Sequence, residues 1–442
     1  YGYFNHAYLA ILVSSVLVNF AIRKFLMGCG RPRRLGLGLG LVFNLGLLFV
    51  FKYFDFFIIN VNAVFKSALP LLHILLPLGI SFFTFQQLSY IIDAYRGNAP
   101  DYSFVDYALF VVFFPQLIAG PIVRHNEMIP QFADAANKAF NYENFAKGIL
   151  AFTLGLAKKV LLADTFGAAA DMVWAGLGTA RSLDALMAML AFTMQIYFDF
   201  SGYCDMATGL GLMMNIRIPQ NFDSPYKSLN VAAFWRRWHM TLGSFFTDYL
   251  YIPLGGSRKG KGRMILNVMI VFLVSGLWHG ANYTFILWGA LHGAAVVISR
   301  LAGTPKKRPW KFLSWLITFV FINLSWVLFR ADTLQDVGRF FAALGNWQGL
   351  TGSATYSWFA PYYTTTLSFL VGKLHIASRY MAYIMAVPWM LVAFYFSVLA
   401  KNTNERLARF RPTAWRAALC IGLFVWSVLA LSNVSRFLYF NF

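Results

Sequence analysis

The sequence predicts an all-α, polytopic integral membrane protein whose 442 residues form a single domain, residues 1–442. Hydrophobic residues make up 59% of the chain and charged residues only 12%, whereas an average soluble domain carries about 25% charged residues. Apolar runs long enough to cross a bilayer recur along the whole chain. Every backbone polar group in lipid needs an internal partner, so these runs predict helices.

The positions of the apolar runs predict the spanning helices, because a helix needs about 20 residues to cross the hydrocarbon core. We predict eleven candidate segments, at residues 7–22, 36–60, 74–92, 104–122, 145–163, 183–214, 264–280, 282–299, 312–329, 380–400 and 415–433. No inverted repeat of the kind found in many transporters is visible. One helical membrane domain is therefore the expected organisation.

Basic residues gather in short clusters between the apolar runs and account for much of the net charge of +20. Four clusters stand out, at residues 23–34, 257–263, 299–311 and 401–412. Lys and Arg in short loops mark the cytoplasmic side of a membrane protein and contact anionic lipid there. We therefore place these clusters in the cytoplasm and expect membrane lipid, and not nucleic acid, as their partner.

The segment between residues 263 and 299 is predicted to be a hairpin, because basic clusters flank it on both sides. The stretch "GLWHGANYTF" then places His279, Gly280 and Asn282 near the turn of the hairpin, away from the cytoplasmic loops. The same parity places residues 331–379 and the final "SRFLYFNF" on the outer side of the membrane.

Two segments are too polar to be ordinary helices that face lipid. Prolines interrupt "FFPQLIAGPIVRHNEMIPQF" (113–132), and broken helices are tolerated in membranes only where the backbone faces protein or water. The segment 195–215 carries Asp199 and Asp205 in an apolar helix, where an unpaired carboxylate facing lipid would cost roughly 3 kcal/mol. We expect the first segment to line a surface of protein or water inside the molecule, and the polar residues of the second segment to face the protein interior.

A third unusual segment, residues 224–256, contains a basic and aromatic cluster made of Trp235, Arg236, Arg237, Trp238 and His239. Such a helix lies either in the membrane interface or beside a buried polar cavity. Trp and Arg at a membrane boundary are often only anchors. The two arginines would also be natural partners for the buried aspartates, in a purely structural role.

Histidines at membrane depth are the strongest candidates for chemistry. An intramembrane ionisable residue is a functional hypothesis by default, and imidazole titrates in the range that suits proton transfer at neutral pH. His239 and His279 stand out for this reason, whereas His292 and His125 are expected to be hydrogen-bonded structural residues.

Several other chemistries lack the residue patterns that they require. The histidines have no spacing typical of a metal site, and the three cysteines are scattered, so no metal is expected. Neither a G-x-S-x-G nucleophile elbow nor a Walker P-loop is present. Acyl chemistry run by a histidine base and transport remain as alternatives.

Five motifs occur along the chain in this order: "FFPQLIAGPIVR", "QIYFDFSGYCDMATGLGLMM", "FWRRWHMTLGSFFTDYLYIPLGG", "GLWHGANYTFILWGALHG" and "FLYFNF". Together they resemble the membrane-bound O-acyltransferase (MBOAT) family, and among its branches the alginate O-acetyltransferase membrane subunit and its relatives acting on peptidoglycan or cellulose. The resemblance implies a helical bundle with re-entrant and interfacial helices around a central funnel. It also implies that an apolar segment normally precedes "YGYFNHAYL". Cys204 stands where relatives commonly carry Ser.

The resemblance also implies roles for individual residues. The family's conserved histidine falls on His279, and its second histidine falls on His239, so both are predicted to be catalytic. The remaining residues are predicted to bind the donor or to support the site, namely Arg236, Arg237, Trp238, Trp278, Asn282, Asp199 and Asp205.

The implied reaction is acetyl transfer across a bacterial inner membrane. A cytoplasmic donor, expected to be acetyl-CoA, enters the funnel, and the acetyl group leaves toward an extracytoplasmic glycan. An extracytoplasmic acyltransferase is expected as a partner protein that hands the acetyl group to the glycan acceptor. Two alternatives stay open, a polytopic transporter or flippase of an acyl donor or glycan, and D-alanyl transfer to teichoic acid.

Overall fold

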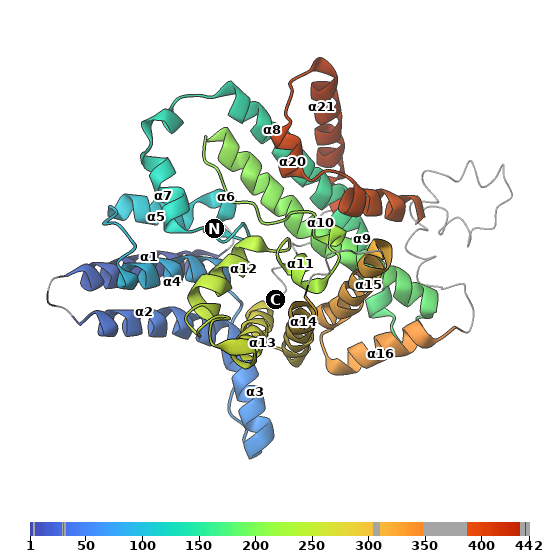
Figure 1. Ribbon diagram of the computed structural model, residues 1–442, viewed down its shortest axis with the longest axis horizontal. Helices are drawn as coiled ribbons and strands as arrows, with labels where there is room; N and C mark the ends of the chain where they lie inside the picture. The colour runs from blue at the N-terminus through green and yellow to red at the C-terminus, as the bar shows by residue number, and fades with distance from the viewer. Residues whose placement is uncertain are drawn as a thin grey trace.

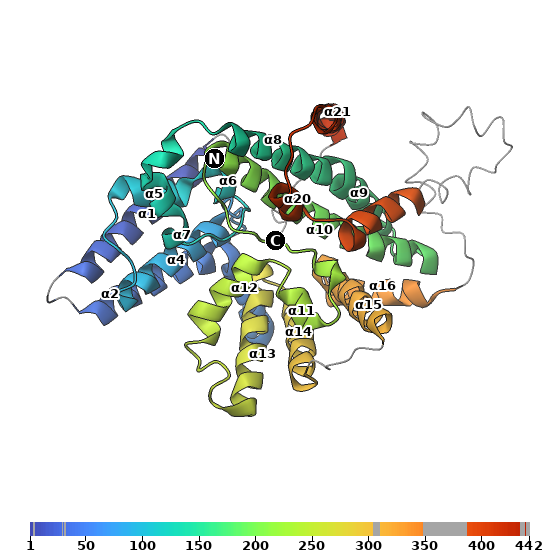
Figure 2. The same ribbon diagram turned by 45° about the horizontal axis from the view of Figure 1, so that its top comes forward.

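In the computed structural model, helices make up all the regular secondary structure of the residues that the structure describes, as the sequence predicts. The structure describes residues 1–2, 5–28, 30, 32–303, 310–347, 387–433 and 438. Within these ranges six helices are long and apolar enough to cross a membrane. Larger groups of helices surround two short central helices, α11 (Val231–Trp235) and α12 (Met240–Phe246), as Figure 1 and Figure 2 show.

The N-terminal group contains one long continuous helix in which a π-helical turn interrupts the α-helical pattern. Its elements are α1 (His6–Met27), α2 (Arg33–Leu48), the π-helical turn η1 (Phe49–Tyr53), α3 (Phe54–Phe65) and α4 (Ile80–Arg96). The elements α2, η1 and α3 run on without a break. The predicted span 74–92 is wrong in its first part, because the helix begins only after Pro77 and Gly79. Every residue from Ile80 to Ile91 is buried, so α4 is a core helix and not a lipid-facing span.

The predicted span 104–122 is also not one helix. It divides into α5 (Phe104–Val112), the single turn α6 (Phe114–Leu117) and a non-helical stretch that leads to α7 (His125–Ala133). Pro115 and Pro121 lack the N–H groups that a continuous helix needs. The buried, interrupted backbone predicted for 113–132 is therefore confirmed.

The second group pairs an interrupted helix with the most buried long helix of the described residues. After the 3-10 turn η2 (Ala135–Lys138), it contains α8 (Tyr142–Ala157), the π-helical turn η3 (Lys158–Ala163), α9 (Asp164–Ala175) and α10 (Ser182–Met213). Helix α10 packs along α8, η3 and α9. Of its most apolar window, 78% is buried inside the protein, so α10 is shielded from lipid over most of its length.

The third group contains the predicted hairpin, which carries His279 and His292. Its helices are α13 (Gly260–His279), α14 (Tyr283–Leu301), α15 (Lys311–Arg330) and α16 (Leu334–Gly345). Helices α13 and α14 approach very closely: a Cβ atom on Gly276 would lie 2.3 Å from the carbonyl oxygen of Phe285. On Gly289 it would lie 2.4 Å from the carbonyl oxygen of Phe272. Small residues at this interface let the two backbones touch.

Two connecting regions complete the described chain. The 3-10 turn η4 (Pro225–Lys227) precedes α11, and the π-helical turn η5 (Thr247–Tyr251) follows α12. The C-terminal region contains the helix Val387–Leu399, which ends in the π-helical turn η7 (Tyr395–Leu399), then α20 (Thr403–Ala408), α21 (Ala414–Leu429) and η8 (Ala430–Asn433). The predictions for residues 348–379, for the start of the span 380–400 and for most of "SRFLYFNF" fall outside the described residues.

Hydrogen bonds join the basic clusters on one face of the molecule, which we call the basic face. Arg33 donates to a carbonyl in the last turn of α4, at 2.9 Å. Arg96, at the end of the same helix, donates to the backbone of Asp248 at 3.2 Å. Arg300, at the end of α14, donates to the hydroxyl of Tyr251 at 3.0 Å. These contacts agree with the predicted hairpin, whose two ends lie on the same side.

The cluster 401–412 reaches the same face through the chain before α11. Asn402 donates to the carboxylate of Asp223 at 3.1 Å, and Lys227 donates to the carbonyl of Ala400 at 2.7 Å. Near the start of α15 the indole of Trp315 donates to the carbonyl of Tyr226 at 2.9 Å. These contacts link the cluster 401–412 to the chain before α11 and to the start of α15, beside the cluster 299–311. The positive-inside rule assigns both clusters to the cytoplasmic side.

Candidate active site

His279 is the last residue of α13 and lies at the turn of the hairpin, as predicted. The helix ends at Gly280, where the chain becomes extended, and a side chain does not fit there because a Cβ atom would lie 2.2 Å from the ring of Phe285. The imidazole is 3% exposed and lies among aromatic rings, with centroid distances of 4.9 Å to Trp278, 5.4 Å to Trp288 and 5.1 Å to Phe329. A 20-residue helix is about 30 Å long, so His279 lies far from the basic face where α13 begins.

Lys52 holds the carbonyl end of α13, and we did not predict it. Its ammonium group donates to the carbonyl oxygens of Trp278 at 2.5 Å and His279 at 3.1 Å, and it lies 5.8 Å from the centroid of the Trp278 ring. The last carbonyls of a helix lack partners within the helix, and a cation there also complements the helix dipole. A lone lysine in the apolar run 36–60 was the sequence signal for this contact.

His239 lies between α11 and α12 in a conformation that is unusual for a residue with a side chain. Its φ is +46°, in the left-handed region, where a non-glycine residue is under strain. Asn221 holds this turn, since its carbonyl accepts from the backbone N–H of Met240 at 3.0 Å. Strained residues of this kind gather at functional sites, which supports the prediction that His239 belongs to one.

The side chain of Asn221 orients the His239 ring. Its Oδ1 atom accepts from the backbone N–H of Thr241 at 3.2 Å and from the hydroxyl of Thr241 at 2.9 Å. The backbone N–H can only donate, so this amide atom must be the oxygen. Nδ1 of His239, 3.1 Å from the same oxygen, must therefore carry a proton and donate it. In the neutral ring Nε2 is then the basic nitrogen.

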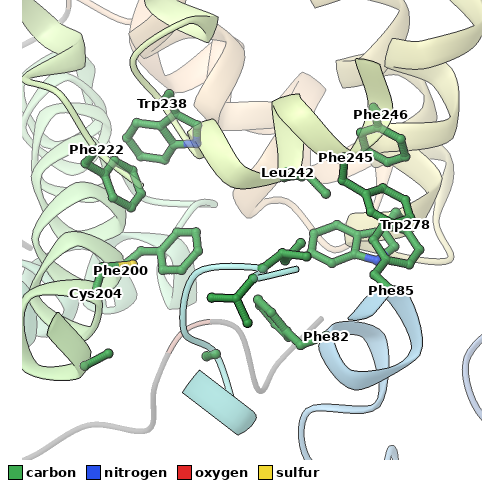
Figure 3. Close-up of a cluster of buried hydrophobic side chains, with 14 of the residues drawn as sticks. Phe82, Phe85, Phe200, Cys204, Phe222, Trp238, Leu242, Phe245, Phe246 and Trp278 are labelled. Atoms are coloured by element: carbon green, nitrogen blue, oxygen red, sulfur yellow. The ribbon is translucent and has the colours of Figure 1, made fainter. Parts of the chain in front are cut away.

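Trp278 lies between the two predicted catalytic histidines. Its ring centroid is 6.0 Å from that of His239 and 4.9 Å from that of His279. Figure 3 shows the packing around this indole, with Phe82, Phe85 and Phe245 near it and with Phe200, Phe222 and Trp238 across the cluster. Phe200 packs edge-on against His239 at 4.8 Å. The fold thus brings together residues that are 40 positions apart.

Two indole N–H groups add hydrogen-bond donors to this aromatic region. Nε1 of Trp278 and Nε1 of Trp288 are buried and have no acceptor among the residues that the structure describes. Each indole ring is a direct neighbour of the His279 ring. A buried donor without a protein acceptor is uncommon and is often found where a ligand supplies the acceptor.

His292 has the structural surroundings that we predicted for it. Its Nδ1 atom accepts from the indole of Trp235 at 3.1 Å, and its Nε2 atom lies 2.9 Å from the hydroxyl of Ser325. The ring is fully buried and joins α14 to α11 and α15. Since both nitrogens are hydrogen-bonded to protein, this histidine is suited to fixing helix packing and not to proton transfer.

Asp199 and Asp205 face the interior, as predicted, but their partners are not the arginines that we expected. Lys159 contacts Asp199 at 2.8 Å, and Lys158 contacts Asp205 at 2.5 Å. The two lysines lie in η3, which packs along α10. Adjacent lysines on a π-helical turn had no recognisable link to the aspartates in the sequence, and the expected pairing with Arg236 or Arg237 is wrong.

The remaining predicted residues divide into packing and surface positions. Trp238 is 2% exposed and stacks on Phe234 at 5.4 Å. Asn282 caps α14 by accepting from the N–H of Thr284. Arg236 is exposed, and Arg237 is partly exposed with its nearest carboxylate, that of Asp223, at 3.9 Å. The two arginines thus lie near the basic face and have weak or no ion pairs with the described residues.

Within the described part of the chain, oxygen, nitrogen and sulfur ligands do not cluster in a way that would hold a metal. The described residues contain no group of three or more His, Cys, Asp or Glu side chains with suitable geometry. The site in these residues is therefore built from two buried histidines, an asparagine that orients one of them, a lysine beside the other and several indole donors.

Comparison with known proteins identifies the family of this chain. The profile of the MBOAT, membrane-bound O-acyltransferase family, matches residues 84–334. The peptidoglycan O-acetyltransferase of Helicobacter pylori is 46% identical over 368 residues, covering 76% of this chain and 70% of that protein. A probable alginate O-acetylase of Pseudomonas putida is 37% identical over 472 residues, covering 100% of this chain and 92% of the relative. The chain belongs to the membrane-bound O-acyltransferase family and is a multi-pass O-acyltransferase.

Proposed function

We propose that this enzyme moves an acetyl group from cytoplasmic acetyl-CoA across the membrane for O-acetylation of an extracytoplasmic polysaccharide such as alginate, cellulose or peptidoglycan. The names of the relatives support an acetyl group and a glycan acceptor. The observation that carries the proposal is the meeting of His239 and His279 around Trp278, about a helix length from the basic face.

In the proposed reaction His279 is the general base. Its neutral imidazole takes the proton of the attacking hydroxyl, and the hydroxyl oxygen forms a bond to the carbonyl carbon of the thioester. The tetrahedral intermediate collapses, the carbon–sulfur bond breaks, and the imidazolium returns the proton to the leaving thiolate. The products are an O-acetyl ester and the free thiol, so no other reactant is needed.

Hydrogen-bond donors near His279 suit the charge that develops on the carbonyl oxygen. The indole N–H groups of Trp278 and Trp288 are the candidates, because each ring borders the imidazole and neither N–H has an acceptor among the described residues. Fixed donors in a site without water stabilise such an oxyanion strongly. Lys52 contributes by holding the backbone that carries both Trp278 and His279.

The donor is proposed to enter from the basic face past Arg236 and Arg237. Phosphate groups favour guanidinium donors, and these two arginines are the exposed basic residues that lie closest in sequence to His239. Asp223, the nearest carboxylate to Arg237, is tied to the basic cluster 401–412 through Asn402.

An extracytoplasmic acyltransferase is the proposed partner, and the glycan acceptor is reached through it. The enzyme alone would then bind and hydrolyse the donor without modifying polymer.

D-alanyl transfer is the second candidate, because a teichoic acid D-alanyltransferase of Bacillus subtilis is 28% identical over 272 residues, covering 57% of this chain and 68% of that relative. Release of CoA from acetyl-CoA by the purified enzyme distinguishes the two.

Replacing the proposed base tests the mechanism directly. His279→Ala should lower acetyl transfer by at least about 10²–10⁴-fold, because no other group would take the proton from the hydroxyl. Release of CoA and acetylation of surface glycan are the measurements, with expression and membrane insertion as checks on folding. His6→Ala, at an exposed histidine, is the matched control. Wild-type acetylation in the His279 variant would contradict the assignment.

Asn221 should control which ring nitrogen of His239 carries the proton. Asn221→Ala removes the acceptor of the Nδ1 proton and should lower acetyl transfer about tenfold or more, since a buried donor loses its partner. Asn221→Asp keeps an acceptor, should retain more activity, and should shift the pH–activity profile to higher pH because a carboxylate favours the imidazolium. Equal activity losses with no shift in the profile would show that Asn221 has only a structural role.

Lys52 should affect catalysis more than donor binding. Lys52→Met removes the ammonium from the end of α13 and should lower kcat about tenfold or more while KM for the donor changes little, because His279 loses its support. Lys52→Arg keeps a charged donor and should recover part of the activity. A rise in KM at unchanged kcat would place Lys52 in donor binding instead.

The two arginines should have the opposite kinetic signature. Arg236→Ala/Arg237→Ala should weaken acetyl-CoA binding about tenfold, the loss typical of a charged hydrogen bond, and should leave kcat at saturating donor nearly unchanged. Arg258→Ala/Lys259→Ala removes two exposed charges from another basic loop and is the matched control. Normal donor affinity in the Arg236/Arg237 variant would remove these residues from the donor site.

A further inference from the structure

A large groove lies between α8 and the C-terminal helices, apart from the histidines. It has a volume of about 1580 Å³, and Leu150, Leu154, Leu419 and Leu423 are among the apolar side chains that line it. Helix α21 packs against α8 and lies away from α12 and α13 (Figure 1). Both helices also carry exposed apolar residues that do not line the groove, such as Phe145 and Val425, as expected for surfaces that face lipid.

The rim of the groove at the basic face has a strong positive charge. It carries five basic residues, Lys401, Arg406, Arg409, Arg411 and Arg416, and one acidic residue, Glu405. None of the five forms an ion pair with a described residue, and the carboxylate of Glu405 accepts from the backbone N–H of Asn402, the N-cap residue of α20. The guanidinium groups of Arg406 and Arg416 each bond only a backbone carbonyl, at 3.1 Å. The rim therefore has a positive charge without a partner in the described protein.

We propose that this groove binds a phospholipid with an anionic headgroup. The headgroup phosphate contacts the arginines of the rim, and an acyl chain lies along the leucines between α8 and α21. Both halves of such a lipid find matching chemistry: cations at the membrane surface attract an anionic headgroup, and the apolar walls exclude water from the chain. The inference does not depend on the proposed acetyl transfer, since the groove lies outside the histidine site.

Lipid retention by the purified full chain tests this proposal. The protein is prepared with phosphatidylglycerol or phosphatidylcholine of identical acyl chains, and bound lipid is counted by native mass spectrometry. We expect phosphatidylglycerol to be retained at least tenfold better. The variant Arg406→Gln/Arg409→Gln/Arg411→Gln/Arg416→Gln should lose this preference. The matched control, Arg258→Gln/Lys259→Gln/Lys261→Gln/Arg263→Gln, removes as many charges from another loop of the basic face and should keep it.

A second variant keeps every charge and fills the apolar part of the groove. Leu154→Trp/Leu423→Trp should lower retention of phosphatidylglycerol while the protein stays folded, as judged by its elution volume and melting temperature. If the rim variant and the matched control lost the preference for phosphatidylglycerol equally, the proposal would be overturned, because the lipid would then be attracted by the overall positive charge and not by the groove. Wild-type retention in both groove variants would also overturn it. So would displacement of the lipid by acetyl-CoA, since the rim would then belong to the donor.

Discussion

The contact between Lys52 and the end of α13 is the interaction on which the rest of the site depends. A helix that stops inside a membrane leaves carbonyl groups that neither water nor lipid can satisfy. The ammonium of Lys52 satisfies the carbonyls of Trp278 and His279, and these carbonyls in turn make a buried cation tolerable. Because the carbonyls and the ammonium satisfy each other, the chain can turn at Gly280 and present the imidazole of His279 far from the basic face.

The same principle explains the other charges inside the helical groups. Lys158 and Lys159 form ion pairs with Asp205 and Asp199 across the interface of η3 and α10. Asp199 also accepts from the backbone N–H of Leu438, so an interior pair anchors a residue near the end of the chain. Buried charges thus specify the segments that meet. The packing of apolar side chains is non-directional and does not specify them.

Three features of the fold were predictable because each depends on a local signal in the sequence. The length of the apolar runs predicted an all-helical protein, the basic loops predicted the hairpin 263–299, and the prolines predicted the broken segment 113–132. The resemblance implied catalytic roles for His239 and His279, but their meeting around Trp278 could not be predicted, since no spacing rule relates them. Asn221 could not be identified, because its role depends on a hydrogen bond to a residue 18 positions away. The partners of the aspartates were wrong for a similar reason: charge alone does not select between arginines nearby in sequence and lysines on another helix.

The π-helical turns of this fold have a consequence for how its sequence can change. Each of η1, η3 and η5 carries charged residues that make contacts described above, among them Lys52, Lys158 and Asp248. A π-turn accommodates about one extra residue, so the helix after it is rotated by roughly 100° relative to a regular α-helix. Loss of a single residue in such a turn would keep the hydropathy of the span and still turn every later side chain to another face. Length in these turns is therefore under stricter constraint than composition.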